Sequence, residues 1–298
     1  METNLRQLYL DIVRRTILGL TYRDPSFNPS NGTQNMFNPT ARENGEDWPV
    51  LAHSMAGEKR LKNIQELADR VLADNVPGDF IETGVWRGGA CIFMSAILKA
   101  SGVTDRNIYV CDSFEGLPPP NVGEYPQDRG DTHYTAPFLA VDLNQVQTNF
   151  AGYGLLDDNI KFVKGFFSET LPKLAPEIEQ LSILRLDGDM YESTIVALEN
   201  LYPKLSVGGY VIVDDYGLPN CRKALADYRE YHGIDDEEYV AIDNSSVYWK
   251  KTKELDPEKA LTRFAQEVTA QPVQAAPVFP WGEPAPLVKS STTSLSSV

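Results

Sequence analysis

The fold is decided by two stretches, Leu184-Arg-Leu-Asp-Gly-Asp-Met-Tyr-Glu-Ser193 and Gly209-Tyr-Val-Ile-Val-Asp-Asp-Tyr216. Each begins as an apolar run of strand length and ends abruptly in carboxylates. A helix over residues 191–205 would separate them, which is the length of a right-handed crossover between parallel strands. The two strands should therefore lie side by side, with their carboxyl ends at the same edge of one sheet.

Four carboxylates follow these strands: Asp187, Asp189, Asp214 and Asp215. Ligands of open α/β sheets bind outside the carboxyl ends of the strands, so these side chains should meet at one crevice. Like charges repel one another unless a cation joins them, and carboxylate oxygens suit a hard cation such as Mg²⁺. Alternatively, some of them cap the next helix or accept loop N–H groups, and this alternative is strongest for Asp189.

Strand and helix patterns alternate along the chain around these stretches. Apolar runs of strand length cover residues 79–82, 108–112, 160–165, 181–187 and 210–215. Residues 238–242 and 247–250, separated by Asp243-Asn-Ser-Ser246, have the pattern of a hairpin. The expected fold class is a doubly wound α/β sheet of seven strands with an antiparallel C-terminal hairpin at its edge.

The remaining segments predict an N-terminal extension and a tail. Residues 1–77 hold two helical patterns, separated by a polar stretch at 24–47 that is expected to be a loop and a possible lid. Residues 78–254 form the α/β core. Residues 255–298 are rich in Ala, Pro, Ser and Thr, which is typical of a flexible tail.

Composition disfavours several classes of protein. The chain has 27 Lys and Arg against 42 Asp and Glu, a formal net charge of −15, so neither nucleic acid nor an anionic membrane is an expected partner. No apolar stretch approaches the roughly 20 residues of a membrane span, and the N-terminus lacks a secretory pattern, so we expect a cytoplasmic protein. Cys91, Cys111 and Cys221 do not resemble a disulfide scaffold. Cys91 and Cys111 lie in apolar runs and are expected in the core.

A glycine turn follows the strand at 79–82. It runs Glu82-Thr83-Gly84-Val-Trp-Arg-Gly88, and its glycines would allow a ligand to approach the backbone. The helix that follows would offer N–H groups to an anion. The spacing differs from the G-x-G-x-x-G of dinucleotide binders and is nearer the acidic-x-Gly-x-x-x-Gly turn that cradles the methionine part of S-adenosylmethionine. The alternative is a turn needed only for packing.

Asp112 ends the next predicted strand, with Ser113 beside it. A carboxylate at this place can accept both hydroxyls of a ribose, as an acidic residue does in nucleoside-binding α/β folds. Glu115 is a less favoured candidate for the same task, and a capping or loop role for Asp112 is the alternative.

Aromatic residues follow a third predicted strand, in Lys164-Gly-Phe-Phe-Ser-Glu169. Phe166 or Phe167 could form one wall of an adenine slot, and Ser168 could reach the edge of the ring. Core aromatics with a serine at a helix start would give the same pattern, and the sequence does not separate these interpretations.

The motifs together resemble those of the macrocin O-methyltransferase (TylF-type) family. They are 82–89 (ETGVWRGG), 111–120 (CDSFEGLPPP), 163–167 (VKGFF), 184–194 (LRLDGDMYEST) and 201–217 (LYPKLSVGGYVIVDDYG). The resemblance extends from about residue 5 to residue 251. It implies a class I methyltransferase fold, which is Rossmann-like, with S-adenosylmethionine and Mg²⁺ as cofactors. It also implies methylation of sugar hydroxyls on macrolides and related natural products.

The resemblance also implies roles for single residues. It makes Asp187, Asp214 and Asp215 the metal ligands, and it assigns the turn at 82–89 and Asp112 to the cofactor.

Other segments match the family less directly. Residues 54–60, which include Met55, are similar to the segment that closes over the cofactor. The polar stretches at 24–47 and 118–137 are the candidate lids, because the lid regions of the family vary with substrate. The sequence beyond residue 254 does not match the family pattern.

The implied reaction transfers a methyl group from a sulfonium to a hydroxyl. A Mg²⁺ ion chelated by two neighbouring hydroxyls would lower the pKa of one of them and orient it. The first candidate for the residue that takes the proton is Asp187, the second is Asp189 and the third is His133.

Several alternatives remain at this point. A Mg²⁺-dependent enzyme acting on a catechol or another non-sugar diol would carry the same motifs. A nicotinamide-dependent oxidoreductase is disfavoured by the glycine spacing, and an inactive scaffold by the full set of carboxylates. The expected partner is a small-molecule acceptor, a glycosylated natural product or another diol. A homodimer or higher oligomer is expected, because the N-terminal helix and the long loops could cover apolar surface.

Overall fold

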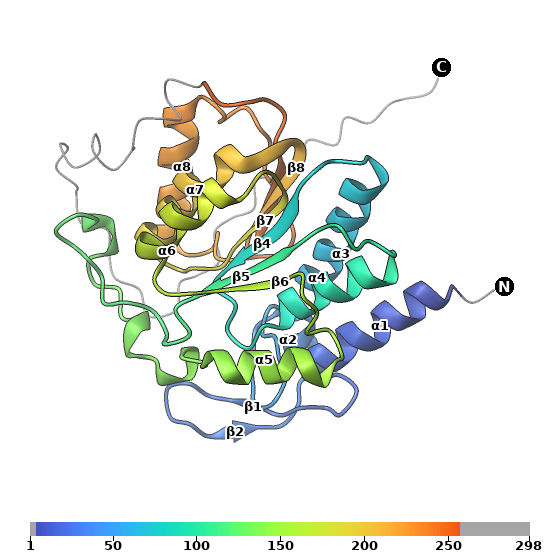
Figure 1. Ribbon diagram of the computed structural model, residues 1–298. Coiled ribbons are helices and arrows are strands. Elements are labelled where there is room, and N and C mark those ends of the chain that lie inside the picture. Colours follow the sequence, from blue (N-terminus) through green and yellow to red (C-terminus); the bar gives the residue numbers. More distant parts are fainter. Residues whose placement is uncertain (1–3, 257–298) are drawn as a thin grey trace, which may run out of the picture.

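A mostly parallel sheet forms the centre of the computed structural model, which describes residues 4–256 (Figure 1). Its seven strands lie in the order β6-β5-β4-β7-β8-β10-β9. Their bounds are β4 (Asp79–Thr83), β5 (Ile108–Asp112), β6 (Ile160–Lys164), β7 (Leu181–Leu186), β8 (Leu205–Val213), β9 (Val240–Ala241) and β10 (Val247–Lys250). The doubly wound sheet of seven strands is thus confirmed.

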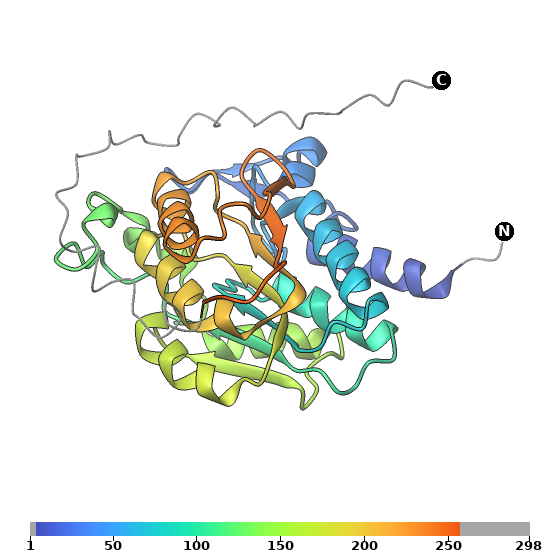
Figure 2. The ribbon, with the colours of Figure 1, turned by 90° about the horizontal axis from the view of Figure 1, so that it is seen from above.

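Helices cover both faces of this sheet. They are α1 (Leu5–Ile17), α2 (Pro39–Asn44), α3 (Gly57–Ala73), α4 (Gly89–Ala100), α5 (Leu143–Gly152), α6 (Phe167–Leu174), α7 (Tyr191–Leu201) and α8 (Pro219–His232). One apolar core holds side chains of α1, α3, α4 and α5, and the other holds those of α6, α7 and α8. Figure 2 shows the two layers from above, with the orange α8 and the blue α3 on opposite sides of the sheet.

The C-terminal hairpin forms as predicted. Strand β10 pairs antiparallel with β8, and β9 pairs antiparallel with β10 at the edge of the sheet. Strand β8 begins at Leu205, earlier than the predicted residue 210, because Leu205 already pairs with Leu181 before a register shift in the ladder. Cys91 and Cys111 are free and buried, as expected, and Cys221 is free and buried as well.

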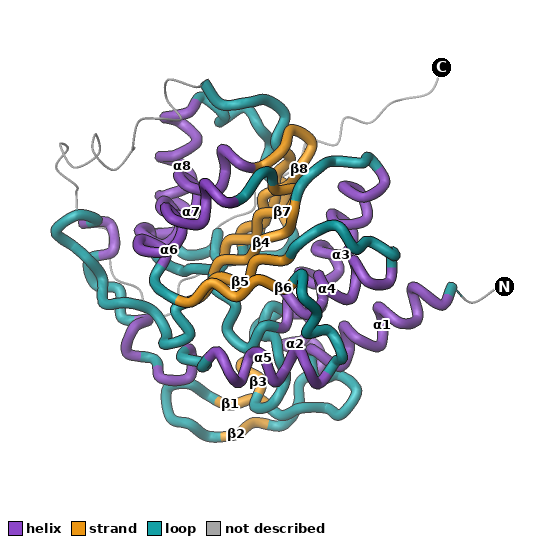
Figure 3. Tube along the Cα trace, viewed as in Figure 1, coloured by secondary structure: helices purple, strands orange, loops and turns teal. Residues whose placement is uncertain are grey.

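The stretch at 24–47 is not the plain loop that was predicted. It contains β1 (Ser26–Phe27), β2 (Gln34–Asn35) and α2, and β1 also pairs with β3 (Trp48–Pro49) in a small sheet of three strands (Figure 3). Asn38 caps α2 by accepting the N–H groups of Thr40 and Ala41. An Asn-Pro step at a helix start is a local signal that hydrophobic periodicity does not detect.

The N-terminal extension shares a core with the sheet rather than standing apart from it, because α1 and α3 pack into the same apolar cluster as α4. Within residues 4–256, no helix is long and apolar enough to cross a membrane. The predicted tail lies outside the described residues from residue 257 onward.

Candidate active site

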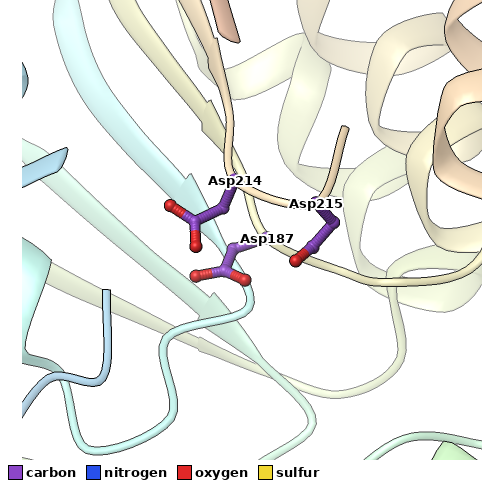
Figure 4. Close-up of side chains that lie close together, drawn as sticks. All are labelled: Asp187, Asp214 and Asp215. Carbon is purple, nitrogen blue, oxygen red and sulfur yellow. The ribbon is translucent and has the colours of Figure 1, made fainter. Parts of the chain in front are cut away.

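Three carboxylates meet at the carboxyl edge of β7 and β8. These strands are parallel neighbours, with Leu186 opposite Val213, so Asp187 and the pair Asp214 and Asp215 leave the sheet together. One carboxylate oxygen from each lies within 4.8 Å of the other two, and Figure 4 shows the three side chains turned toward a common point. The juxtaposition that strand adjacency predicts is therefore present.

The carboxylates of this cluster lie close enough to change one another's pKa values. Burial, together with the neighbouring carboxylates, raises the pKa of Asp187 to about 8. Burial and the charges of Asp189 and Asp187 raise the pKa of Asp215 well above its usual range. Burial would also raise the pKa of Asp214, but Arg185 and Arg60 hold it below the usual value. Without a cation, the cluster favours partial protonation.

Two buried arginines that the sequence analysis did not single out hold Asp214. Arg185, within β7, pairs with Asp214 and Glu82 and also with Asp187, at 2.6 Å. Arg60, near the start of α3, reaches the other oxygen of Asp214 at 2.5 Å. A signal was present for Arg185, because a charged residue inside an apolar strand needs buried partners. The sequence could not say which ones.

Asp189 occupies the turn after β7 in a different way. Its backbone is left-handed, with φ of 60°, and its N–H donates to Asp215 Oδ2 at 3.0 Å. Asp189 therefore shapes the turn through its backbone. The structural alternative predicted that some of these carboxylates accept loop N–H groups, and the one that does so here is Asp215. The side chain of Asp189 also lines the same cavity as the three clustered carboxylates. Asp189 is not part of the group whose oxygens lie within 4.8 Å.

The glycine turn after β4 lies directly against the carboxylate edge. Gly84 has φ of 86°, and a β-carbon there would collide with the carbonyl oxygen of Asp187. This packing alone requires glycine. The N–H groups of Gly84, Val85, Gly88 and Gly89 donate to protein oxygens, so these four N–H groups do not offer the free donors that were expected. The turn instead brings the two candidate sites into contact.

Asp112 organises this turn from the end of β5. Its two oxygens accept the N–H groups of Val85 and Phe114, each at 2.7 Å. Burial raises the pKa of Asp112, against the effect of these hydrogen bonds. Ser113 Oγ donates to the carbonyl of Gly116 at 2.6 Å. The predicted alternative Glu115 is exposed and pairs with Lys164, on the outer surface.

One cavity of about 1400 Å³ joins most of the predicted residues. Its lining includes Met55, Glu82, Gly84, Asp112, Ser113, Phe166, Phe167, Ser168, Asp187, Asp189, Asp214 and Asp215. Thr83 and Gly88 do not line it. Thr83 Oγ1 instead donates to the carbonyl of Arg185, and Gly88 packs against α5. The carboxylate of Glu82 is already paired with Arg185 and accepts the thiol of Cys91 at 2.6 Å.

Both candidate lid segments border this cavity. The second one is anchored by Asp128, which is fully buried and accepts the N–H groups of Tyr191 and Glu192 at 2.8 and 2.9 Å. Asp128 therefore caps α7 from a distant loop, beside the turn that carries Asp189. In the same loop, His133 pairs with Asp131, and this hydrogen bond raises the pKa of His133 to about 9.

Aromatic side chains connect the two lid segments. Phe27 and Trp48, from the small sheet, lie 5.4 and 4.8 Å, between ring centroids, from Phe138, the residue that directly follows the second segment. Trp86 of the glycine turn donates its indole N–H to the carbonyl of Phe138 at 2.9 Å. All four residues line the cavity. The end of the second segment thus meets the small sheet beside the glycine turn.

Comparison with known proteins gives a family match over most of the chain. The family model described as macrocin-O-methyltransferase (TylF) matches residues 6–251. Mycinamicin III 3''-O-methyltransferase of Micromonospora griseorubida is 47% identical over 249 residues, which are 83% of this chain and 97% of that protein. The 8-demethyl-8-(2,3-dimethoxy-alpha-L-rhamnosyl)-tetracenomycin-C 4'-O-methyltransferase of Streptomyces olivaceus is 48% identical over 255 residues, 85% of this chain and 95% of that one.

Solved structures agree with this match. The O-methyltransferase NovP superimposes with a TM-score of 0.76 at 44% identity, covering 83% of this chain and 100% of that chain. The calicheamicin methyltransferase CalS11, at 24% identity, has a TM-score of 0.54 over 66% of this chain and 80% of that chain, and it supports the fold alone. The fold is that of the class I methyltransferases.

Proposed function

The chain belongs to the macrocin O-methyltransferase family, and from that premise we propose that it is an O-methyltransferase that depends on S-adenosylmethionine and Mg²⁺. Its acceptor would be a sugar-like vicinal diol on a natural product, as in antibiotic biosynthesis. The tetracenomycin relative, by its name, methylates a rhamnosyl compound. Family membership disfavours the alternative of a nicotinamide-dependent oxidoreductase. It does not decide whether the acceptor is a sugar or another diol.

The observation that carries the proposal is the contact between the glycine turn and the carboxylate cluster at Gly84 and Asp187. A methyl donor in the turn and a metal-bound hydroxyl at the cluster would then be neighbours. Such proximity supplies a large share of the rate in a transfer between two bound partners.

The residues present fit both cofactors. Three oxygen ligands within 4.8 Å are the donors that Mg²⁺ prefers, and a dication would offset the burial and the carboxylate repulsion that together raise the pKa of Asp215. For the donor, the same cavity offers the carboxylate of Asp112, the hydroxyl of Ser168 and the ring of Phe166. Pockets for one drug-sized ligand are usually about 300–1,000 Å³, so about 1400 Å³ leaves room for an acceptor as well.

Bound S-adenosylmethionine would supply the electrophilic methyl group, and Mg²⁺ held by Asp187, Asp214 and Asp215 would acidify and orient the acceptor hydroxyl. The chain must also accept the hydroxyl proton. Asp187 was the first candidate, but its Oδ2 is paired with Arg185 and it belongs to the metal cluster. His133 is protonated at neutral pH because of Asp131. We therefore assign the proton acceptor to Asp189, at the cavity wall.

Methyl transfer to a glycosylated acceptor tests this proposal. We expect the chain to add one methyl group, measured by mass spectrometry, with loss of activity in EDTA and recovery when Mg²⁺ is restored. S-adenosylhomocysteine should raise the melting temperature and NAD should not. Full activity in EDTA would reject the metal role, and stabilisation by NAD alone would reject the donor.

A further inference from the structure

Arg60 joins three parts of the molecule that are distant in the sequence. It lies near the start of α3 and is 9% exposed. Its Nη1 donates to Asp214 Oδ2 at 2.5 Å, and its Nε donates to Asp243 Oδ2 at 2.7 Å. Asp214 ends β8, and Asp243 lies in the turn between β9 and β10. A single guanidinium therefore holds a carboxylate of the candidate metal site and a carboxylate of the edge hairpin.

The segment before Arg60 runs along the cavity. Ser54, Met55, Ala56 and Lys59 line the cavity together with Arg60. We call residues 54–60 the closing segment. At its other end, the carbonyl of the preceding residue, His53, accepts the N–H of Gly89 at 3.0 Å, at the start of α4. The closing segment is thus tied to the cofactor turn at one end and to Asp214 at the other.

We propose that Arg60 is a positioning residue that couples the cofactor site to the metal site through the closing segment. This inference rests on the function proposed above. A cofactor bound in the cavity would lie against the closing segment and favour the position of Arg60 in which its guanidinium holds Asp214. A cation held by Asp214 would favour the same position, so binding at either site strengthens binding at the other. The effect must be reciprocal.

The geometry requires arginine and not only positive charge. The guanidinium is planar, and its Nε and Nη1 reach two carboxylates from different loops at the same time. Asp214 and Asp243 raise the pKa of Arg60 against the effect of burial, so the group stays charged. A lysine would keep the charge but has one ammonium group, which cannot reproduce this fork. Arg60→Lys therefore tests whether the coupling needs the two-pronged geometry of the guanidinium or only its positive charge.

Calorimetric titration of the full chain tests the coupling. S-adenosylhomocysteine is titrated with and without saturating Mg²⁺, and Mg²⁺ with and without S-adenosylhomocysteine. In the unmodified chain we expect each ligand to bind more tightly when the other is present, by roughly fivefold or more, the lower end of typical couplings. In Arg60→Lys and Arg60→Gln this ratio should fall close to one. Arg70→Lys, at an exposed position of the same helix, should keep the full ratio.

A ratio of one or less in the unmodified chain, or an unchanged ratio in Arg60→Lys, would overturn the coupling. Failure of either ligand to bind the unmodified chain would instead reject the proposed function, so the two failures are distinguishable. If the Arg60 variants do not fold, as judged by thermal denaturation, Asp243→Asn serves in their place. It weakens the anchor of Arg60 and leaves Asp214 unchanged, so the ratio should again fall, and an unchanged ratio would count against the coupling.

Discussion

Asp187 and Asp189 lie two residues apart, and their surroundings differ. Asp187 is paired with Arg185 and faces Asp214 and Asp215, whereas Asp189 lines the cavity outside that group. We expect Asp189→Asn to lower kcat by about 10²–10⁴, the usual contribution of a general base, with Mg²⁺ affinity retained. Asp187→Asn should lose Mg²⁺ affinity as well as activity.

Single-turnover kinetics and Mg²⁺ titration of both variants measure the two effects separately. Because each substitution replaces a carboxylate by an amide of the same shape, each variant serves as the control for the other. Loss of Mg²⁺ binding in Asp189→Asn, or near-normal kcat in that variant, would contradict the division of roles.

Single residues also mark the limit of what the sequence can predict. The three clustered aspartates follow from strand adjacency, because parallel neighbours end at one edge. Their partners do not follow from it. Arg60 and Asp214 are 154 positions apart in the sequence, and no local pattern records a pairing of that range. For Arg185, the sequence shows that a charged residue within an apolar strand needs buried partners, but it does not show which residues these are.

Helix α7 depends on a cap that another element supplies. The N-cap residue, Met190, makes no side-chain hydrogen bond at the helix start, and Asp128 accepts the N–H groups of Tyr191 and Glu192 from 63 and 64 positions away. The alternation of strands and helices was predictable from apolar periodicity. This cap was not, because its loop shows neither periodicity nor a local capping motif.

Asp128→Ala tests whether the cap also positions the lid. We expect it to lower the free energy of unfolding by about 1–3 kcal/mol, because the buried N–H of Tyr191 and the half-buried N–H of Glu192 lose their acceptor. It should also raise KM for the acceptor, since the loop that carries His133 loses its anchor beside Asp189. Urea unfolding and steady-state kinetics measure the two results.

The matched control is Asp142→Ala, which removes the cap of α5 at an exposed position. It should lower stability by about 0.5–2 kcal/mol and leave the acceptor KM unchanged. An unchanged KM in Asp128→Ala would restrict Asp128 to a structural role.

At the scale of the whole molecule, α1 has two apolar faces. Leu10, Val13 and Ile17 are buried in the core with α4. Leu5, Leu8 and Ile12 are 76%, 49% and 53% exposed and follow one side of the helix. A stripe of exposed apolar residues is typical of a protein interface, and symmetric dimers bury the same patch of both copies. We therefore expect a homodimer in which the outer face of α1 is buried.

Leu8→Glu tests this expectation, because a charge in the buried centre of an apolar interface would lack a partner. Sedimentation should give a dimer for the unmodified chain and a monomer for Leu8→Glu at the same concentration, with S-adenosylhomocysteine binding retained. Val240→Glu is the matched control, since Val240 is 42% exposed, close to the 49% of Leu8, and lies in β9 at the edge of the main sheet, whereas α1 packs with α4. It should remain a dimer. A monomeric unmodified chain would contradict the expected homodimer. A dimeric Leu8→Glu variant would exclude the outer face of α1 as the interface, because a charge buried at that interface would prevent the dimer from forming.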